Sequence, residues 1–578
     1  MTDRIKEINE KHSDFYTRAY LLEELTGEKA VVKDTAVYIA DNLLMPLSST
    51  ELKLFCVKEY NNIITIRGFY HSICEDFAPV LVYNNQIFNA NIHISENDFY
   101  RPKYAEKNTA VLKIFEFVFK FEIDDTIRIS LKTASGRIVS PKLTHTNFSP
   151  FSAIKRFKIP FHTCENTVFT VTPKNNILFV EKSNFEVIKH YTMCNAVNMN
   201  TIEDTKLFLY YLEHYKEYEG RKIWLFSDRK NTADDNGWAL YNYAKKQNDG
   251  IEKYFIINKT GYDKLKKENP EDENIVCTEN FDTFMLIAFA EKWASSLTKT
   301  ILFSSGTPAI QFLYVYDRSK FIFLQHGITK DDVTDFYNER RYNPEMFVAT
   351  AKKEFDYITN SSAFGYPEGV VKLTGFPRFD NRVYNEPPEK IITFAPTWRY
   401  SISGMTETEF KASDYYKMLI DFLTDPILLK TLEKNNFKII LKLHPLAKQF
   451  GRFFADISEC ITIGDNLSYA ELFKKSAMLI TDFSSVFFDF AYSERPVIYY
   501  QKLPNHHKPT YFNYEKDGFG EIITEKEELI KAIAEFTENS KNNIFPKQKK
   551  KYLDRINDFF GNIDNNNCKR TYDAIFEL

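Results

Sequence analysis

The sequence lacks the motifs of the common nucleotide-binding and metal-binding proteins. It has no G-x-G-x-x-G and no G-x-x-x-x-G-K-[ST], which disfavours a standard dinucleotide fold and a P-loop ATPase. It has no D-x-D pair, so a diphosphate bridged by a metal ion has little support. Its seven cysteines are scattered without a C-x-x-C, which argues against a disulfide framework or structural zinc and suits a reducing compartment. We therefore expect no metal and no cofactor.

The chain also lacks a strong charge and a long apolar run. Its formal net charge of −4 gives no general reason to bind nucleic acid. No run of about 18 apolar residues could span a membrane, and the start, MTDRIKEINEKHSDFY, is too charged for a signal peptide. These features predict a cytoplasmic protein that does not bind nucleic acid. They leave attachment to a membrane surface open.

The 578 residues are too many for one core and divide by their patterns. Residues 1–34 read as a charged helical segment. Residues 35–190 carry short alternating apolar runs between turn residues, which predict a β-rich, sandwich-like accessory domain. Strands then alternate with amphipathic helices, and this pattern restarts after LTGFPRFD. It predicts two α/β units with parallel sheets, residues 195–375 and residues 376–578 with C-terminal helices, and a cleft between them.

Polar side chains follow several of the predicted α/β strands. In open α/β sheets ligands bind beyond the carboxyl ends of the strands, so we expect these side chains to line one site. Cationic side chains, together with hydroxyls at a helix start, are the donors that a diphosphate needs. The candidates are His326 after KFIFL, Thr397 and Arg399 after KIITFA, Lys442 and His444 at the end of KIILKLH, and Asp482, Ser484 and Ser485 after MLIT.

Each candidate also has a structural interpretation. TDFSS reads as an ordinary helix N-cap, with Asp482 as the local cause of the helix start. Arg399 alone fits a surface ion pair, and a lone histidine is usually structural. Two histidines at strand ends of two units, however, suit proton transfer near neutral pH. Four such motifs on one sheet edge favour ligand binding.

A further polar cluster lies in SDRKNTADDNGWALYNYAKK. Carboxylates at a strand-to-helix turn can bind the hydroxyls of a polyol acceptor. The same DDNG string is an equally good helix N-cap. The sequence leaves both interpretations open for Arg229, Asp234, Asp235 and Asn236.

As an ordered set, these motifs resemble the CDP-glycerol glycerophosphotransferase family, which comprises teichoic-acid polymerases and primases and related capsule enzymes. The resemblance covers residues 200–520 and is specific because of the order of its motifs. Many relatives have Trp before His-Gly where this chain has Gln325. The matching strings are RKNTADDNGWAL, FLQHGITKDD, LTGFPRFD, FAPTWR, LKLHP and ITDFSSVFFDFA.

The resemblance implies a GT-B-type fold of two Rossmann-like units that works without a metal ion. It implies attachment at the cytoplasmic face of the membrane, where a lipid-linked polymer grows. It makes His326 the base on the acceptor hydroxyl, and His444 a contact to the donor diphosphate or a proton donor to the leaving group. Thr397, Arg399, Ser484 and Ser485 match the family's phosphate-binding positions, and Asp482 leads that loop.

The leading functional hypothesis is the transfer of an alditol phosphate from CDP-glycerol or CDP-ribitol to the hydroxyl end of a lipid-linked teichoic-acid or capsule polymer, with release of CMP. One alternative is a nucleotide-sugar glycosyltransferase, for example one that uses CMP-sialic acid. A second is a non-catalytic scaffold in polymer assembly. The sequence does not separate glycerol from ribitol, primase from polymerase, or wall polymer from capsule. It also leaves open whether the chain forms a homo-oligomer.

Overall fold

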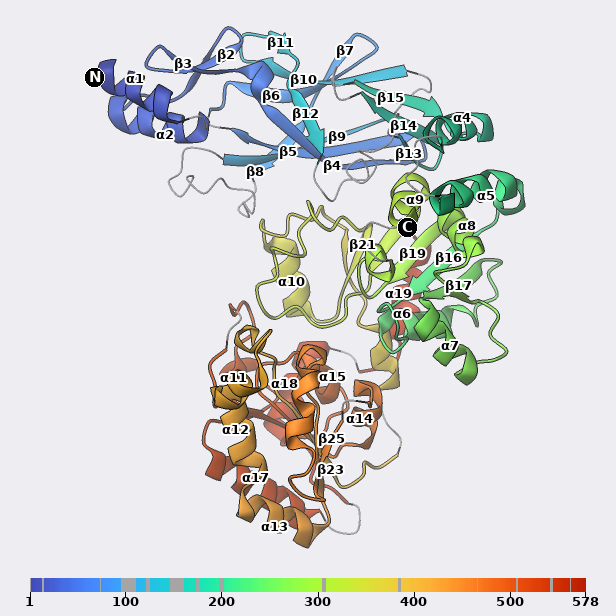
Figure 1. The fold of residues 1–578 in the computed structure, drawn as a ribbon, viewed down its shortest axis with the longest axis vertical. Coiled ribbons are helices and arrows are strands. Elements are labelled where there is room, and N and C mark those ends of the chain that lie inside the picture. Colours follow the sequence, from blue (N-terminus) through green and yellow to red (C-terminus); the bar gives the residue numbers. More distant parts are fainter. Residues whose placement is uncertain are drawn as a thin grey trace.

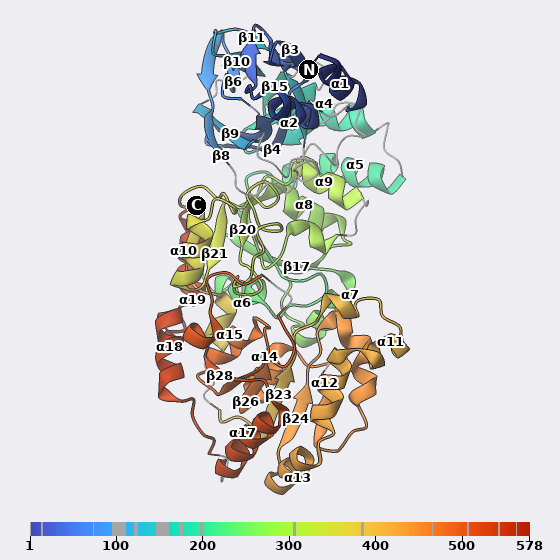
Figure 2. The ribbon, with the colours of Figure 1, turned by 90° about the vertical axis from the view of Figure 1, so that its left-hand side faces the viewer.

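A computed structural model shows three parts stacked along the long axis of the molecule (Figures 1 and 2). A β-rich part lies at one end, a first α/β unit lies in the middle and a second α/β unit lies at the other end. The structure describes residues 2–12, 15–72, 74–94, 111–120, 125–145, 161–172, 177–196, 202–303, 308–382, 386–464, 466–505, 508–540, 544–561 and 563–578.

The β-rich part consists mainly of antiparallel strands. One sheet has the order β12-β4-β5-β9-β8, and another has β13-β14-β15-β10-β6-β7 with β11 beside β10. A three-stranded sheet, β1-β2-β3, lies beside them. Only β12 pairs in parallel, with β4, among the pairs described in these sheets. The elements are α1 (Thr2–Lys11), α2 (Phe15–Thr26), β1 (Val31–Lys33), β2 (Ala36–Ile39), β3 (Asn42–Pro46), β4 (Glu51–Tyr60), β5 (Ile63–Ser72), β6 (Phe77–Tyr83), β7 (Gln86–Asn89), β8 (Asn91–Ile94), β9 (Val111–Lys120), β10 (Asp125–Thr133), β11 (Ile138–Val139), β12 (Lys142–His145), β13 (Phe161–Thr163), β14 (Thr167–Thr172), β15 (Ile177–Lys182) and α4 (Phe185–Ala196).

The first α/β unit contains a parallel sheet in the order β18-β17-β16-β19-β20-β21-β22. Its strands β16 and β21 are buried throughout, as expected for a sheet covered by helices on both faces. The elements are α5 (Ile202–Tyr218), β16 (Ile223–Ser227), α6 (Asn236–Ala244), β17 (Glu252–Ile257), α7 (Lys259–Glu268), β18 (Ile275–Cys277), α8 (Phe281–Phe289), β19 (Ala290–Ser295), α9 (Pro308–Tyr316), β20 (Lys320–Phe323), β21 (Met346–Ala349), α10 (Lys352–Asn360), β22 (Val371–Leu373) and the 3₁₀ turn η3 (Pro377–Asn381).

The second α/β unit contains a parallel sheet in the order β25-β24-β23-β26-β27-β28. The predicted α/β architecture with parallel sheets is therefore confirmed. The elements are β23 (Ile391–Ala395), α11 (Glu407–Ala412), α12 (Asp414–Leu423), α13 (Pro426–Asn435), β24 (Lys438–Leu441), the 3₁₀ segment η5 (Pro445–Phe454), β25 (Ile461–Ile463), α14 (Tyr469–Lys475), β26 (Met478–Thr481), α15 (Val486–Ala491), β27 (Val497–Tyr500), α16 (Tyr514–Asp517), β28 (Gly520–Ile523), α17 (Lys526–Asn539), α18 (Lys550–Phe560) and α19 (Asn567–Phe576).

The last helix corrects the boundary expected from the sequence. Residues 376–578 were expected to form one unit, but α19 lies against α6 of the first unit (Figure 1). The ring of Tyr572 lies 5.4 Å from that of Trp224 on β16, and Lys292 Nζ donates to the Ile575 carbonyl at 2.6 Å. The chain therefore ends by packing onto the first sheet, so α19 helps to hold the two units together.

Polar and apolar contacts join the β-rich part to the first α/β unit. One apolar cluster runs from the β-sheets into the helices around α8 and α9. Arg67 on β5 forms a buried ion pair with Glu339, and Tyr60 on β4 donates to Glu345 at 3.1 Å. Thr163 donates to the Val315 carbonyl at 2.8 Å. These contacts fix the β-rich part against α9 and the segment that follows β20.

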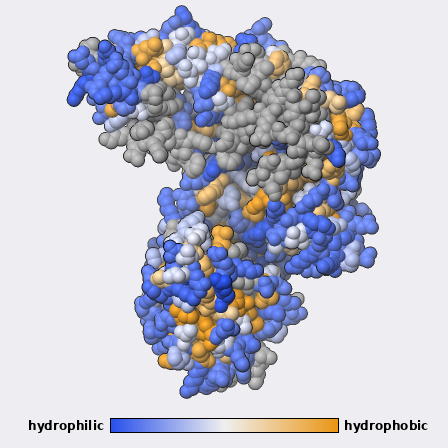
Figure 3. All heavy atoms as spheres, in the orientation of Figure 1, coloured by the Kyte–Doolittle hydropathy of each residue, from blue (hydrophilic) through white to orange (hydrophobic). Residues whose placement is uncertain are grey.

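The visible surface is mostly hydrophilic, and apolar residues gather on the front of the second unit (Figure 3). In the described part of the chain, no helix has both the length and the apolar character needed to cross a membrane.

Candidate functional site

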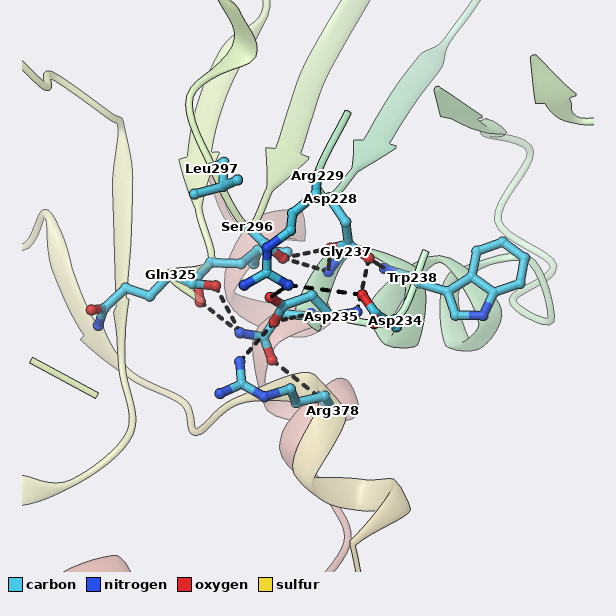
Figure 4. A network of polar contacts seen from close by, with 12 residues as sticks. Asp228, Arg229, Asp234, Asp235, Gly237, Trp238, Ser296, Leu297, Gln325 and Arg378 are labelled. Carbon is cyan, nitrogen blue, oxygen red and sulfur yellow. Dashed lines mark hydrogen bonds and ion pairs between the residues drawn. The ribbon is translucent and has the colours of Figure 1, made fainter. Parts of the chain in front are cut away.

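The carboxyl ends of β16 and β19 meet at the start of α6. Asp228 follows β16, and its carboxylate accepts from the backbone N–H of Asp235 at 3.0 Å, Gly237 at 2.7 Å and Trp238 at 3.1 Å (Figure 4). Ser296, after β19, donates its hydroxyl to Asp228 at 2.5 Å. Burial and the neighbouring Asp235 raise the pKa of Asp228 to about 7. Asp228 therefore holds the α6 start onto the sheet edge.

Gly237 allows this close approach. A β-carbon at Gly237 would lie 2.1 Å from the backbone carbonyl oxygen of Ser227, a contact that no side chain can tolerate. The glycine of DDNG is thus required by the packing of α6 on β16.

Asp235 and Asn236 are buried and engaged with the protein itself. Asp235 caps α6 by accepting from the Asn236 N–H at 2.9 Å, and it accepts from Arg378 Nη1 at 2.8 Å. Asn236 donates to the carbonyls of Leu324 at 3.1 Å and Gln325 at 2.8 Å. Asp235 therefore makes the cap contact expected of an N-cap, whereas the Asn236 amide holds the loop before His326.

Arg378, in η3, joins the two α/β units. Besides Asp235, it contacts Asp489 on α15 through Nε at 2.6 Å and through Nη2 at 2.8 Å. Burial opposes charge on Asp489, but Arg378 outweighs it and lowers the pKa of that carboxyl. The LTGFPRFD motif thus supplies a buried cation between two acids of different units.

Arg229 behaves differently from its neighbours in the cluster. Its side chain is 47% exposed and lies 3.5 Å from Asp235 and 3.9 Å from Asp234. Burial lowers the pKa values of both His326 and His444, and the charge of Arg229 lowers them further. Arg229 therefore lies near both candidate catalytic histidines, one on each α/β unit, with a guanidinium that a ligand can reach.

A buried network sets the shape of the loop that carries His326. Gln325 adopts φ +58°, a left-handed conformation that is uncommon outside glycine. Its amide donates to the Val348 carbonyl at 2.6 Å and to Glu354 at 3.1 Å, and it accepts from the Thr329 hydroxyl at 2.9 Å. Glu354 also accepts from the backbone N–H of Thr329 at 2.8 Å and of Thr350 at 2.7 Å. Burial raises the pKa of Glu354 to about 7.

The side chain of His326 is exposed to solvent, and the ring of Tyr337 lies 6.5 Å away. Desolvation by nearby protein atoms is the main cause that lowers the pKa of His326, and a backbone hydrogen bond to Ser296 acts in the opposite direction. A backbone group that raises a histidine pKa is a carbonyl accepting from the ring. At neutral pH the ring is therefore a neutral imidazole, oriented by Ser296, with its other nitrogen able to accept a proton.

The loop after His326 docks on the second unit. Asp332 donates its N–H to the Lys508 carbonyl at 2.9 Å, and the Thr510 hydroxyl donates to the Lys330 carbonyl at 2.7 Å. Lys330 is itself buried and pairs with Asp331 at 2.5 Å. The loop that follows His326 is thus held by contacts to both α/β units.

In the second unit, Asp482 organises the strand ends. It accepts from the Thr397 N–H at 2.7 Å and from Arg399 Nη2 at 2.7 Å, and the Thr397 hydroxyl also donates to it. The backbone N–H of Phe483 also donates to the Asp482 carboxylate, at 2.7 Å. Asp482 therefore ties the Thr397 loop to β26 and does not cap α15, which corrects the interpretation of Asp482 as the cause of the helix start.

Arg399 and Lys442 are occupied by contacts within the protein. Arg399 is buried against Asp482, and Lys442 Nζ donates to the carbonyls of Gly464 at 3.0 Å and Leu467 at 2.6 Å. Both predicted phosphate donors thus stabilise loops of the second unit in this structure.

His444 lies at the start of η5, exposed to solvent, with its ring stacked near Trp398 at 5.8 Å between centroids. Its Nδ1 accepts from the Leu446 N–H at 3.3 Å. In the neutral ring the proton is therefore on Nε2, which faces away from this contact and can donate.

Ser485 occupies the N-cap position of α15 but makes no side-chain cap hydrogen bond. The simple capping interpretation therefore does not hold for its hydroxyl. A β-carbon at Gly327 would lie 3.2 Å from Ser485 Oγ, and the rest of its surroundings within 4 Å is open. Ser484 and Ser485 are half-buried. The structure thus brings the His326-Gly327 loop of one unit opposite the TDFSS loop of the other.

Several residues of this site were missed by sequence reasoning. Asp228 and Glu354 are isolated acids whose roles depend on burial, and Trp398 is adjacent to Thr397 but was not singled out. Arg378 and Asp489 lie within strings quoted for the family resemblance, yet their spacing of more than a hundred residues carries no pairing signal. Only an alignment of homologues would reveal such partners.

In the described residues, no group of three His, Cys, Asp or Glu side chains is placed to hold a metal ion. The expectation of a metal-free reaction stays a prediction.

Comparisons with known proteins place these strand ends in one family. A family model described as CDP-Glycerol:Poly(glycerophosphate) glycerophosphotransferase matches residues 208–577. The chain is 29% identical over 604 residues to the minor teichoic acid biosynthesis protein GgaB of Bacillus subtilis (strain 168), an alignment that covers 98% of this chain and 64% of GgaB. The chain thus spans slightly less than two thirds of that relative.

Two further similarities cover less of the chain. It is 23% identical over 509 residues to the teichoic acid ribitol-phosphate polymerase TarL of Staphylococcus aureus (strain NCTC 8325 / PS 47), covering 78% of this chain and 84% of TarL. The solved structure of the wall teichoic acid polymerase TagF aligns with a TM-score of 0.46 at 18% identity, covering 68% of this chain and 97% of that chain. Because the family model spans more than half of the 578 residues and includes all the strand ends described above, the chain belongs to the CDP-glycerol:poly(glycerophosphate) glycerophosphotransferase family.

Proposed function

We propose that the protein transfers an alditol phosphate from a CDP-alditol to the terminal hydroxyl of a lipid-linked teichoic-acid or capsule-type polymer and releases CMP. The observation that carries this proposal is the approach of Gly327 to Ser485, which sets a neutral histidine of the first unit opposite free hydroxyls of the second. The two loops belong to the motifs that the family shares, and the family's own description names glycerophosphate transfer.

His326 acts as the general base. A neutral imidazole oriented by Ser296 accepts the proton from the acceptor hydroxyl as its oxygen attacks the β-phosphorus of the donor. A new P–O bond forms, and the bond from the β-phosphorus to the bridging oxygen breaks. That electron pair leaves with CMP. Most of the catalysis comes from positioning and from stabilising charge on the diphosphate.

The diphosphate is held by groups that the structure leaves accessible. Arg229 offers a half-exposed guanidinium, and Ser484 and Ser485 offer hydroxyls. Nε2 of His444 donates to the diphosphate or to the leaving oxygen. Arg399 and Lys442 support the same site indirectly, because Arg399 holds Asp482 and Lys442 holds the carbonyls of Gly464 and Leu467. Asp482 in turn positions Thr397.

The same proposal includes the finer architecture and the cellular setting. The two α/β units form a GT-B-type module, with residues 195–375 on the acceptor side and 376–578, apart from α19, on the donor side. The β-rich segment is a sandwich-like accessory domain. The protein works at the cytoplasmic face of the membrane, where its acceptor is anchored, and CDP-glycerol and CDP-ribitol are the candidate donors.

The test is CMP release from a panel of CDP-glycerol, CDP-ribitol and CMP-sialate with a synthetic lipid acceptor. We expect release from a CDP-alditol only when acceptor is present, and a new phosphodiester resonance in the phosphorus NMR spectrum of the product. His326→Ala should lower the rate roughly 10²–10⁴-fold, the usual contribution of a general base. Release from CMP-sialate alone, without a new phosphodiester, contradicts the proposal.

A further inference from the structure

Asn236 is fully buried at the start of α6, and its side-chain amide connects three segments of the chain. Its Nδ2 donates to the carbonyls of Leu324 at 3.1 Å and Gln325 at 2.8 Å. Its Oδ1 accepts from the backbone N–H of Arg378 at 3.2 Å. Both donors and the oxygen of the amide are therefore engaged within the protein. Any role of Asn236 in the reaction has to act through these neighbours.

The two carbonyls that Asn236 binds are the last two before His326. Strand β20 ends at Phe323, so both carbonyls lie beyond the strand. Successive carbonyls of an extended strand point in opposite directions. Gln325 has φ +58°, and this left-handed turn of the chain brings the carbonyls of Leu324 and Gln325 onto one amide. Asn236 therefore fixes the backbone immediately before the proposed base.

Asn236 is itself held in place by the residues on either side of it. The backbone N–H groups of Asp235 and Gly237 donate to the buried Asp228 at 3.0 Å and 2.7 Å (Figure 4). The N–H of Gly237 also lies 3.0 Å from the hydroxyl of Ser296, to which it donates. Asp228 follows β16 and Ser296 follows β19. The amide of Asn236 thus projects from a support that is anchored to two strands of the first sheet.

Arg378, the third partner of the amide, extends these contacts to the donor side of the site. Its guanidinium contacts Asp489 on α15 through Nε at 2.6 Å and through Nη2 at 2.8 Å. Its Nη1 donates to Asp235 at 2.8 Å. Helix α15 begins at Val486, directly after Ser485, so Asp489 lies about one turn behind the TDFSS loop. Buried contacts therefore run without a break from the proposed phosphate loop to the backbone before the proposed base.

We propose that Asn236 is a positioning residue of the transfer reaction, which sets the distance between His326 and the TDFSS loop. The inference rests on the proposed function. Asn236 acts on the base through the two carbonyls before His326, and on the donor side through Arg378 and α15.

The chemical step should depend on this distance more than donor binding does. A general base has to lie within hydrogen-bond reach of the proton that it removes. A displacement of about 1 Å at a reacting centre can lower the rate about 10²-fold. The groups proposed to hold the diphosphate, by contrast, make no printed contact with the Asn236 amide and stay in place when it is removed. Loss of the amide should therefore lower kcat and leave the affinity for the donor unchanged.

The test compares Asn236→Ala with the matched control Asn435→Ala. The Asn435 amide also donates twice, to the Thr431 carbonyl and the Thr537 hydroxyl at 3.1 Å each, where α13 packs on α17 at the far end of the second unit (Figure 1). We expect kcat for CMP release to fall at least about tenfold in Asn236→Ala, with an unchanged Kd of the CDP-alditol in calorimetry. Asn435→Ala should keep both wild-type values. All proteins are assayed below their denaturation midpoints. Asn236→Asp, which keeps the size of the side chain but loses Nδ2, should show the same loss and replaces Asn236→Ala if that variant does not fold.

The link through Arg378 predicts that two variants are not independent. Asp489→Asn weakens the ion pair of Arg378 with α15 but leaves the Asn236 amide in place. Because both changes loosen the same link, kcat in Asn236→Ala combined with Asp489→Asn should fall by less than the two single fold-losses multiplied together. A combined loss equal to that product refutes the link.

A titration of His326 separates this inference from the proposed function, because it needs no turnover. The pKa of His326 is followed by NMR in protein labelled at histidine, and the signal is assigned with His326→Gln. Nearby protein atoms lower this pKa, so release of the loop in Asn236→Ala should raise it toward the ordinary value of about 6.5. The charges that also act on it, Arg229, Asp235 and Arg378, are unchanged in the variant.

The outcomes differ for the two proposals. If folded Asn236→Ala keeps the wild-type kcat and the wild-type pKa of His326, the positioning role is refuted and the proposed function stands. If the wild type releases no CMP from any donor, yet the pKa of His326 rises in Asn236→Ala and not in Asn435→Ala, the proposed function fails and the hold of Asn236 on His326 stands.

Discussion

Gly327 of the first α/β unit lies directly opposite Ser485 of the second, so that a β-carbon on Gly327 would come within 3.2 Å of the serine hydroxyl. The two units therefore approach each other closely at this point. His326, which precedes Gly327, is the proposed base, and Ser485 is a proposed phosphate ligand. The reaction is expected to occur where these two loops meet.

Gly327→Ala should lower kcat by up to about 10²-fold, because a displacement of about 1 Å at a reacting centre can cost that much. The measurement is the initial rate of CMP release at saturating donor. In a double-mutant cycle with Ser485→Ala, the fold-loss of kcat in the double variant should be smaller than the product of the two single fold-losses. The reason is that removing the serine hydroxyl relieves its contact with the new β-carbon. Losses that multiply would show that the two positions act independently.

Arg229 and Arg399 should respond differently to replacement by alanine. Arg229 is half-exposed in the cleft, so Arg229→Ala should lower kcat/KM for the CDP-alditol at least about tenfold without changing the denaturation midpoint, as expected for a lost charge-assisted contact to phosphate. Arg399→Ala leaves Asp482 buried without its cation and should destabilise the protein by about 3–5 kcal/mol. Urea denaturation monitored together with activity checks both. An unchanged denaturation midpoint in Arg399→Ala contradicts its structural role.

The pH profile follows from the lowered pKa of His326. Burial and then the charge of Arg229 lower it, against the pull of Asp235, below the ordinary value of about 6.5. The base works only when neutral, so kcat/KM should stay level as the pH falls through about 6.5 and decline only below it. In Arg229→Gln one cause of the lowering is gone, and the decline should move to higher pH. A wild-type midpoint above 6.5, or no shift in the variant, contradicts this assignment.

Arg378 should be essential for stability. Arg378→Ala leaves Asp235 and Asp489 buried without their shared cation, which should cost about 3–5 kcal/mol. Arg452→Ala is the matched control, because its ion pair with Glu407 at 3.2 Å is solvent-exposed and should contribute at most about 1 kcal/mol. Equilibrium denaturation measures both. Similar losses in the two variants would mean that the buried pair is not the joint between the units.

Glu354 is expected to support both the stability of the protein and the position of the His326 loop. Glu354→Ala removes the acceptor of the Gln325 amide and of the Thr329 and Thr350 N–H groups, and each unmet buried donor costs about 1–3 kcal/mol. We expect lower stability together with a lower kcat, because the His326 loop loses its support. The exposed Glu433→Ala is the control and should change neither. Loss of stability with unchanged kcat shows that the network does not position His326.

The order of strands and helices could be predicted from the sequence because both patterns are local. Alternating apolar residues between turns indicated the β-rich part, and continuous apolar runs such as IWLFS indicated buried parallel strands. His326, His444 and Ser485 were predicted as site residues because polar residues after such runs fall at the edge of a parallel sheet where ligands bind. The position of α19 was missed because nothing local in NCKRTYDAIF distinguishes a helix that packs on the second sheet from one that returns to the first.

The sequence by itself determined the class of the fold and the family, and it predicted the sheet edge at which the site lies. Only the tertiary structure decided what each polar residue does there. Arg229 and Arg399 are equally cationic in the sequence, but one reaches the cleft and the other is buried against an acid more than eighty residues away. The physical reason is that the energy of a charge depends on its surroundings: burial and partners decide whether a side chain supports the protein or remains available to a ligand. Those partners come from distant parts of the chain that only folding brings together.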